Sequence, residues 1–124
     1  MTYTVKSKIW LERDDEKVFG AGPLDLLRRV ERTGSLLQAA EEINMSYSHA
    51  WSLVRSLETK LGFPLLLKQA GGKGGGGSVL SNEGLKLADR YERFQGEADR
   101  MIQALFERYF AQGPDSGDLR EVGE

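Results

Sequence analysis

The stretch TGSLLQAAEEINMSYSHAWSLVRSLETKLG, residues Thr33–Gly62, predicts two short helices joined by a tight turn. Ser35 is suited to cap the first helix, which should end near Ile43. Its apolar face is expected to be formed by Leu36, Leu37, Ala39, Ala40 and Ile43. The following Asn-Met-Ser is typical of a turn, and Ser46 is suited to cap the second helix. We therefore expect a helix-turn-helix at the centre of the fold.

The second helix, expected over about residues 46–61, has two different faces. Its apolar residues recur at spacings of four, three and four and form one buried stripe, which Gly62 ends: Ala50, Val54, Leu57 and Leu61. The other face carries hydroxyls, two aromatic rings and a guanidinium, from Tyr47, Ser48, Trp51, Ser52 and Arg55. A helix that enters the major groove of DNA needs such hydrogen-bonding groups, with apolar residues behind them. This pattern predicts a DNA recognition helix.

The run GSLLQAAEEINMSYSHAWSLVRSLETKLGFPLLLKQAGGKGGGGSVLSNEG resembles the N-terminal DNA-binding domain of molybdate-responsive (ModE-type) transcriptional regulators. The SYSHAW segment and the AGGKGGGG segment are its specific pieces, and the resemblance extends from about Gly22 to about Phe110. More distantly, the run is similar to the winged helix-turn-helix of LysR-type regulators. The resemblance implies a homodimer that binds double-stranded DNA and regulates transcription.

In ModE-type regulators a separate C-terminal portion binds molybdate. This chain ends at Glu124, so we expect the molybdate-binding module to be absent and identify no molybdate site, cofactor or metal site in it. The expected domain is residues 1–112, followed by a disordered tail at residues 113–124.

A glycine-rich wing is expected directly after the recognition helix. Residues 63–68 have an extended, apolar character, residues 69–77 (QAGGKGGGG) would form the tip, and residues 78–80 would return as a strand. Lys68 and Lys73 would then contact DNA phosphates, together with backbone N–H groups of the tip. A floppy surface loop is the alternative. A phosphate-binding P-loop is excluded, because Gly74 follows Lys73 where Ser or Thr is required.

Some of the predicted DNA contacts have competing explanations. Ser35 could meet a phosphate at its helix N-terminus, but a simple cap explains it better. Ser46 and Ser48 belong to the same predicted contact set. Trp51 could lie in the core rather than beside the DNA backbone, and Arg55 could hold either phosphate or guanine.

The N-terminal part predicts a short β-ribbon and one helix. Residues 3–11 alternate loosely between polar and apolar, residues 13–17 suit a turn, and residues 18–19 would form the returning strand. A helix is expected over about residues 23–33. Its arginines, Arg28, Arg29 and Arg32, would form a solvated face.

The last helix should run from Ser81 to about Ala111. A helix of about 30 residues is about 45 Å long, more than this small core needs. Its apolar stripe therefore predicts a dimer interface made by Ala88, Tyr91, Gln95, Ala98, Ile102, Leu105 and Tyr109. The alternative is that the helix is buried wholly against the N-terminal ribbon.

Composition limits the class of protein. The 124 residues are 40% apolar and 29% charged, include no cysteine, and contain no long apolar run, which favours a cytoplasmic globular domain. The predicted elements and the resemblance give its fold class: mainly α with a small β component. No nucleophile–base pair or metal cluster is evident, so we do not expect an enzyme. The net charge of −2 is unusual for a DNA-binding protein. It leaves open a winged-helix protein-interaction module that does not bind DNA.

Overall fold

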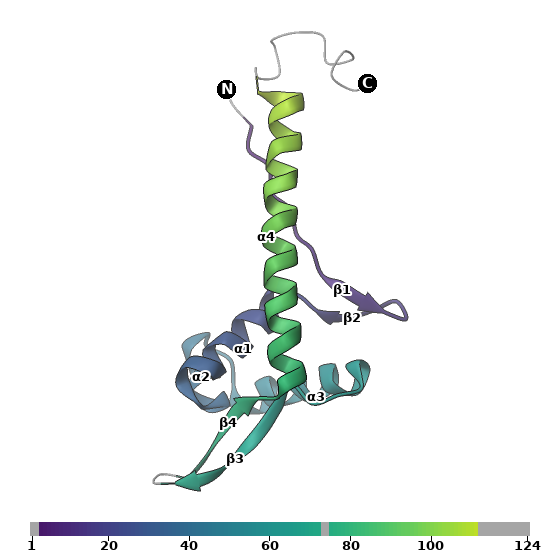
Figure 1. The fold of residues 1–124 in the computed structure, drawn as a ribbon. Helices are drawn as coiled ribbons and strands as arrows, with labels where there is room; N and C mark the ends of the chain where they lie inside the picture. The colour runs from purple at the N-terminus through teal and green to yellow at the C-terminus, as the bar shows by residue number, and fades with distance from the viewer. Residues whose placement is uncertain (1–2, 73–74, 112–124) are drawn as a thin grey trace. The chain divides into compact units, whose positions relative to one another are not determined.

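The computed structural model describes residues 3–72 and 75–111 of the chain. They form two compact units, one of residues 9–92 and one that joins residues 3–8 to the described residues after Glu92. Along the chain lie β1 (Leu11–Arg13), β2 (Glu16–Phe19), α1 (Ala21–Thr33), α2 (Leu36–Glu42), α3 (Tyr47–Leu61), β3 (Leu66–Gly72), β4 (Gly75–Leu80) and α4 (Asn82–Phe110) (Figure 1). The predicted fold class is confirmed: a mainly α winged helix-turn-helix with a long C-terminal helix. Within the described ranges, no helix is long and apolar enough to cross a membrane.

The helix-turn-helix is set by local signals that the structure confirms. The Ser35 side chain accepts a hydrogen bond from Gln38 N (3.1 Å) and caps α2, and the Ser46 side chain accepts one from His49 N (3.1 Å) and caps α3. Between the two helices Asn44 adopts a positive φ of 56°, a conformation that asparagine tolerates better than most residues. The turn can therefore be short, and it fixes α3 against α2.

The core of the 9–92 unit gathers the apolar faces of three helices around two aromatic rings. Ala50, Val54 and Leu57 of α3 are buried, as predicted. Phe19 of β2 packs edge-to-face on Tyr91 with 5.3 Å between ring centroids. The Tyr91 hydroxyl donates to Ile9 O (2.7 Å), so the polar end of this buried ring is satisfied.

This core corrects part of the predicted dimer stripe. Ala88 is completely buried and Tyr91 is 1% exposed, within their own chain. Neither side chain is available to a partner, so their assignment to the dimer interface is wrong. A helical stripe of apolar residues indicates burial, but it does not say which surface buries it.

The wing is a β-ribbon of β3 and β4 with a shorter tip than expected. Antiparallel pairing runs from Leu66↔Leu80 to Gly72↔Gly75, so residues 69–72 and 75–77, assigned to the tip, lie in strands. The Glu58 carboxylate of α3 anchors the start of β3 by accepting from Leu65 N (2.7 Å) and Leu66 N (3.1 Å). The base of the wing is thereby tied to α3.

The returning strand of the wing also contacts the turn between α1 and α2. Ser78 N donates to Gly34 O (2.9 Å). A Cβ on Gly77 would lie 2.4 Å from the same carbonyl oxygen, which is too close for any other residue without a backbone shift. Glycine at 77 therefore permits β4 to lie against this turn.

The N-terminal ribbon is smaller than predicted. Residues 3–10 form no strand, and the pairing is restricted to Leu11–Arg13 with Glu16–Phe19. The alternating pattern of the first residues has no second strand opposite it to provide a ladder. Asp14 and Asp15 make the turn with positive φ values of 54° and 64°.

Three arginines of α1 form an ion-pair network rather than the solvated face that was expected. Arg28 donates to Asp89 (2.8 Å), Glu92 (2.7 Å) and Glu31 (3.1 Å), and so links α1 to α4. These bonds, chiefly the one to Asp89, raise the Arg28 pKa above its usual value against the opposing effect of burial. Arg29 and Arg32 both form ion pairs with Glu42 of α2, and Arg29 also forms one with Asp25.

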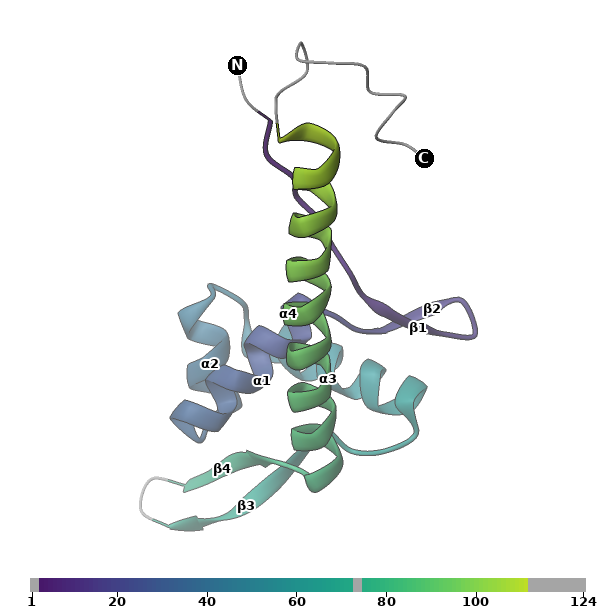
Figure 2. The same cartoon turned by 45° about the horizontal axis from the view of Figure 1, so that its top comes forward.

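In the second unit, residues 3–8 run along the later part of α4 (Figure 2). The Ser7 hydroxyl donates to Asp99 (3.4 Å), and the Tyr3 ring lies edge-on to Phe110. The half-buried side chains on this part of α4 are Gln95, Ala98, Ile102, Phe106 and Tyr109. Phe94, Met101 and Leu105 remain 51%, 72% and 52% exposed. The alternative of a wholly buried α4 is therefore wrong for the described chain.

Candidate nucleic-acid interface

The face of α3 that points away from the core is polar. Tyr47 is 46% exposed, and Ser48, Ser52 and Arg55 are also exposed, whereas Ala50 and Val54 on the other side are buried. All four exposed side chains come from the first three turns of the helix. The structure thus brings these predicted site residues together on one open surface.

Two cations lie close to the Trp51 ring on this surface. The Arg55 guanidinium carbon is 5.2 Å from the centroid of the Trp51 ring, and the Lys68 ammonium of β3 is 5.8 Å from it. Trp51 is half-buried and packs against the core, so the core alternative holds in part, while its place beside the DNA backbone stays a prediction. The ring holds one cation from α3 and one from the base of the wing, by cation–π attraction.

The two serines predicted to contact DNA at helix starts act as N-caps. The Ser35 and Ser46 side chains already accept from backbone N–H groups of α2 and α3, and Ser46 Oγ also lies 3.5 Å from Ser48 Oγ. For Ser35 the simple cap that the sequence favoured is observed. A hydroxyl that accepts from an N–H can still donate its own hydrogen, so contact with a phosphate stays a prediction for both serines.

The wing supplies one described cation to the candidate interface. Lys68 is exposed and pairs across the ribbon with Ser78. Lys73, the other predicted wing contact, lies outside the described residues.

Two features of the surface were missed from the sequence. Thr59 is exposed on α3, four residues after Arg55, and extends the polar face by one turn. Its spacing in the sequence would have revealed it. Leu37 was assigned to the apolar face of α2 but is 48% exposed. It follows a buried leucine directly, and the sequence offered no signal for which of the two points outward.

Comparison with known families matches the part of the chain that holds these elements. The sequence model described as "Bacterial regulatory helix-turn-helix protein, lysR family" matches residues 23–85, from α1 through the wing into α4. The chain belongs to this LysR family. The matched residues are those of the family's helix-turn-helix, and they include α1, α2, α3 and the wing.

Relatives of this LysR-family chain include a molybdenum-pterin-binding protein and proteins named ModE. It is 36% identical over 95 residues to "Molybdenum-pterin-binding protein MopB" of Rhodobacter capsulatus, covering 77% of this chain and 35% of that protein. It is 33% identical over 69 residues to "DNA-binding transcriptional dual regulator ModE" of Escherichia coli (strain K12), covering 56% of this chain and 26% of that protein. The chain thus spans about a third or less of the length of these relatives.

A solved structure, "Crystal structure of CbnR_DBD-DNA complex", has 22% sequence identity and a TM-score of 0.49, over 64% of this chain and 86% of that one.

Proposed function

We propose that this chain binds double-stranded DNA as a homodimer, with α3 in the major groove and the β3–β4 wing along the phosphate backbone. The relatives of ModE type are named as transcriptional regulators, and the proposal extends that role to this chain. The observation that carries it is the exposed polar face of α3, with Tyr47, Ser48, Ser52 and Arg55 in front of a buried apolar stripe.

The chemistry of this face suits the edges of base pairs. Hydroxyl groups can donate and accept, and a guanidinium can bind two acceptors of guanine at once. The Trp51 ring contacts the Arg55 and Lys68 cations, which reduces the freedom they would lose on binding DNA. Lys68 is a point charge at the base of the wing and is suited to phosphate.

The test is DNA binding measured over a range of salt, on the protein's own promoter region and on random DNA. Tyr47→Ala and Arg55→Ala should each weaken specific binding by about 1–3 kcal/mol and reduce the preference for the promoter DNA. Lys68→Met should weaken binding to both DNAs and make the slope of log affinity against log salt shallower by up to roughly 2 in a dimer. Lys86→Met, at an exposed position of α4, is the matched control.

Unchanged binding by folded Tyr47→Ala and Arg55→Ala variants would show that α3 does not contact the bases. If the wild-type protein shows no preference for any tested DNA and no salt dependence, the protein-interaction alternative takes the place of this proposal.

The dimer part of the proposal rests on the apolar side chains that α4 leaves open. Phe94, Ala98, Met101 and Leu105 follow one another at spacings of four, three and four, the repeat of a helix–helix seam. Three of them are more than half exposed in the single chain. Pairing of two such helices would bury them, and it would place two recognition helices for two half-sites.

Sedimentation at several protein concentrations tests the dimer. Leu105→Asp should dissociate it, because an unpaired charge in an apolar contact is costly. Gln103→Glu adds a charge on the opposite side of α4 and should leave the dimer intact. Wild-type protein that sediments as a monomer at micromolar concentration would refute the dimer, without affecting the assignment of α3.

A further inference from the structure

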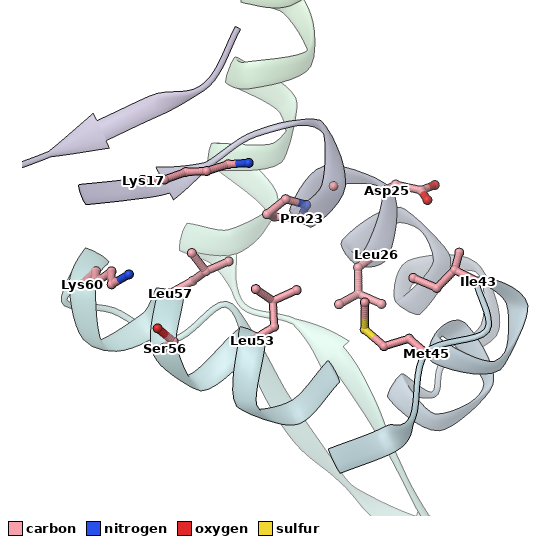
Figure 3. Close-up of a pocket in the computed structure, with 11 residues that line it drawn as sticks. Lys17, Pro23, Asp25, Leu26, Ile43, Met45, Leu53, Ser56, Leu57 and Lys60 are labelled. Atoms are coloured by element: carbon pink, nitrogen blue, oxygen red, sulfur yellow. The ribbon is translucent and has the colours of Figure 1, made fainter. Parts of the chain in front are cut away.

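A pocket of about 460 Å³ opens within the 9–92 unit, on a different face of α3 from the proposed DNA contacts. Pockets that hold small organic ligands have volumes of about 300–1,000 Å³ and are mostly apolar with a few polar groups. The apolar wall here comes from α1, from the turn before α3, and from α3 itself: Leu26, Met45, Leu53 and Leu57 (Figure 3). Its size and lining are those of a small-molecule site.

The polar groups of this pocket are distributed unevenly. Lys17 of β2 and Lys60 of α3 enter from the same end, and both side chains reach toward the space next to Leu57 (Figure 3). Neither ammonium is in an ion pair with any carboxylate of the described residues, although Lys17 lies 5.9 Å from the Trp10 ring centroid. The one acidic lining residue, Asp25, is bound to Arg29 (3.1 Å) and lies toward the other end.

The start of α1 adds to the positive character of the pocket. Gly22 and Pro23 belong to the lining, and the helix begins at Ala21 with no side-chain cap and no acidic residue in its first turn. The N-terminal end of a helix carries a partial positive charge from its unpaired N–H groups. Two ammonium groups and a helix N-terminus thus border an apolar cavity.

We propose that this pocket binds a small amphipathic carboxylate, a molecule with one carboxylate and a compact apolar body. The carboxylate lies between the ammonium groups of Lys17 and Lys60, and the apolar body lies on Leu26, Met45, Leu53 and Leu57. A carboxylate is a strong acceptor for ammonium donors, and the apolar wall removes the rest of the ligand from water. Because the ligand would contact α3 and the turn before it, its site adjoins the proposed recognition helix.

The test uses nuclear magnetic resonance of the ¹⁵N-labelled protein of residues 1–124, titrated with 4-phenylbutanoate. The matched probe, 4-phenylbutan-1-ol, has the same apolar body without the charge. We expect saturable shifts of the amide signals around Met45 and along residues 53–60. The dissociation constant of the alcohol should be roughly tenfold higher than that of the carboxylate. Because the measurement needs no DNA, its result is independent of the proposed DNA binding.

Two variants remove one charge each while keeping an apolar stem. Lys60→Met and Lys17→Met should each weaken binding of the carboxylate several-fold and leave the weak binding of the alcohol nearly unchanged. Lys86→Met, outside the pocket, is the control. The proposal is overturned if the acid and the alcohol bind equally, if both lysine variants bind the acid as the wild type does, if neither probe saturates, or if the shifts fall on the exposed apolar side chains of α4 instead.

Discussion

Two glycines of α4 should respond in opposite directions to the same substitution. A Cβ on Gly84, in the first turn, would lie 2.5 Å from Leu65 O and 3.2 Å from Leu65 C, the backbone just before the wing. A Cβ on Gly96, in the middle of the helix, would have only the flexible end of Arg100 near it, at 3.7 Å. Gly84→Ala and Gly96→Ala are therefore a matched pair in one helix.

The expected magnitudes follow from two opposing effects. Alanine is favoured over glycine within a helix by about 1 kcal/mol, so Gly96→Ala should raise the free energy of unfolding by that amount. At Gly84 the same gain is opposed by overpacking, which typically costs about 1–3 kcal/mol. Because the obstructing atoms are backbone, and Ser81 N also donates to Leu65 O (2.9 Å), we expect the upper end of that cost. The net destabilisation of Gly84→Ala is then about 2 kcal/mol, and the two variants differ by about 3 kcal/mol.

Urea unfolding followed by circular dichroism, at one fixed protein concentration, measures this difference. With a slope of about 1.5–2 kcal/mol/M, the two unfolding midpoints should lie about 1.5–2 M apart, on either side of the wild type. The Gly84→Ala variant should also bind DNA more weakly, because the shifted backbone leads into the wing. If Gly84→Ala is as stable as Gly96→Ala, the first turn of α4 does not approach Leu65 as described.

Three further changes test other contacts of the same unit. Gly77→Ala should destabilise the protein by about 1–3 kcal/mol in urea unfolding, because its Cβ would collide with Gly34 O, and an equally stable variant would contradict that approach. Glu58→Gln should cost about 1 kcal/mol by the same assay, since a neutral amide accepts less strongly from Leu65 N and Leu66 N, and no change would show that these bonds contribute nothing. Hydrogen bonds, chiefly from Arg32 and secondly from Arg29, lower the Glu42 pKa below its usual value near 4.5. The ionised Glu42 therefore stabilises the folded protein fully above that pH, and this stabilisation is lost as the pH falls through the lowered pKa. Between pH 3 and 6, the Glu42→Gln variant should therefore lose less stability on acidification than the wild type. If the free energies of unfolding of the two proteins fall in parallel with pH, Glu42 does not contribute in this way.

The elements that the sequence predicted well are those with local causes. The caps at Ser35 and Ser46 and the helix end at Gly62 each depend on groups within four residues, so a pattern of residue types is sufficient. The buried face of α3 followed from spacing alone. The exposed polar face was predicted as its complement, which is why the candidate interface appears where it was expected.

The errors concern contacts between residues far apart in the sequence. Arg28 is joined to acids 61 and 64 residues away, and nothing in its neighbourhood indicates them. Tyr91 was assigned to a partner because spacing predicts burial but not the surface that provides it. In the wing, pairing with an opposite strand keeps glycine-rich residues in strands despite their poor intrinsic preference.

The net charge of −2 is compatible with a DNA-binding surface, because several acidic side chains are bound to partners within the chain. Asp25, Glu31, Glu42, Asp89 and Glu92 are bound to the three arginines of α1. Glu58 is turned to the backbone of β3. The cations of the candidate interface differ: Arg55 and Lys68 lie on the Trp51 ring, and neither is in an ion pair within the described part of the chain. Exposed charges are screened beyond about 10 Å at 0.1 M salt, so a phosphate near α3 responds to these cations and far less to acids elsewhere on the chain. The total charge of the chain is therefore a poor indicator of whether it binds DNA. Which individual charged side chains are in ion pairs is a better indicator.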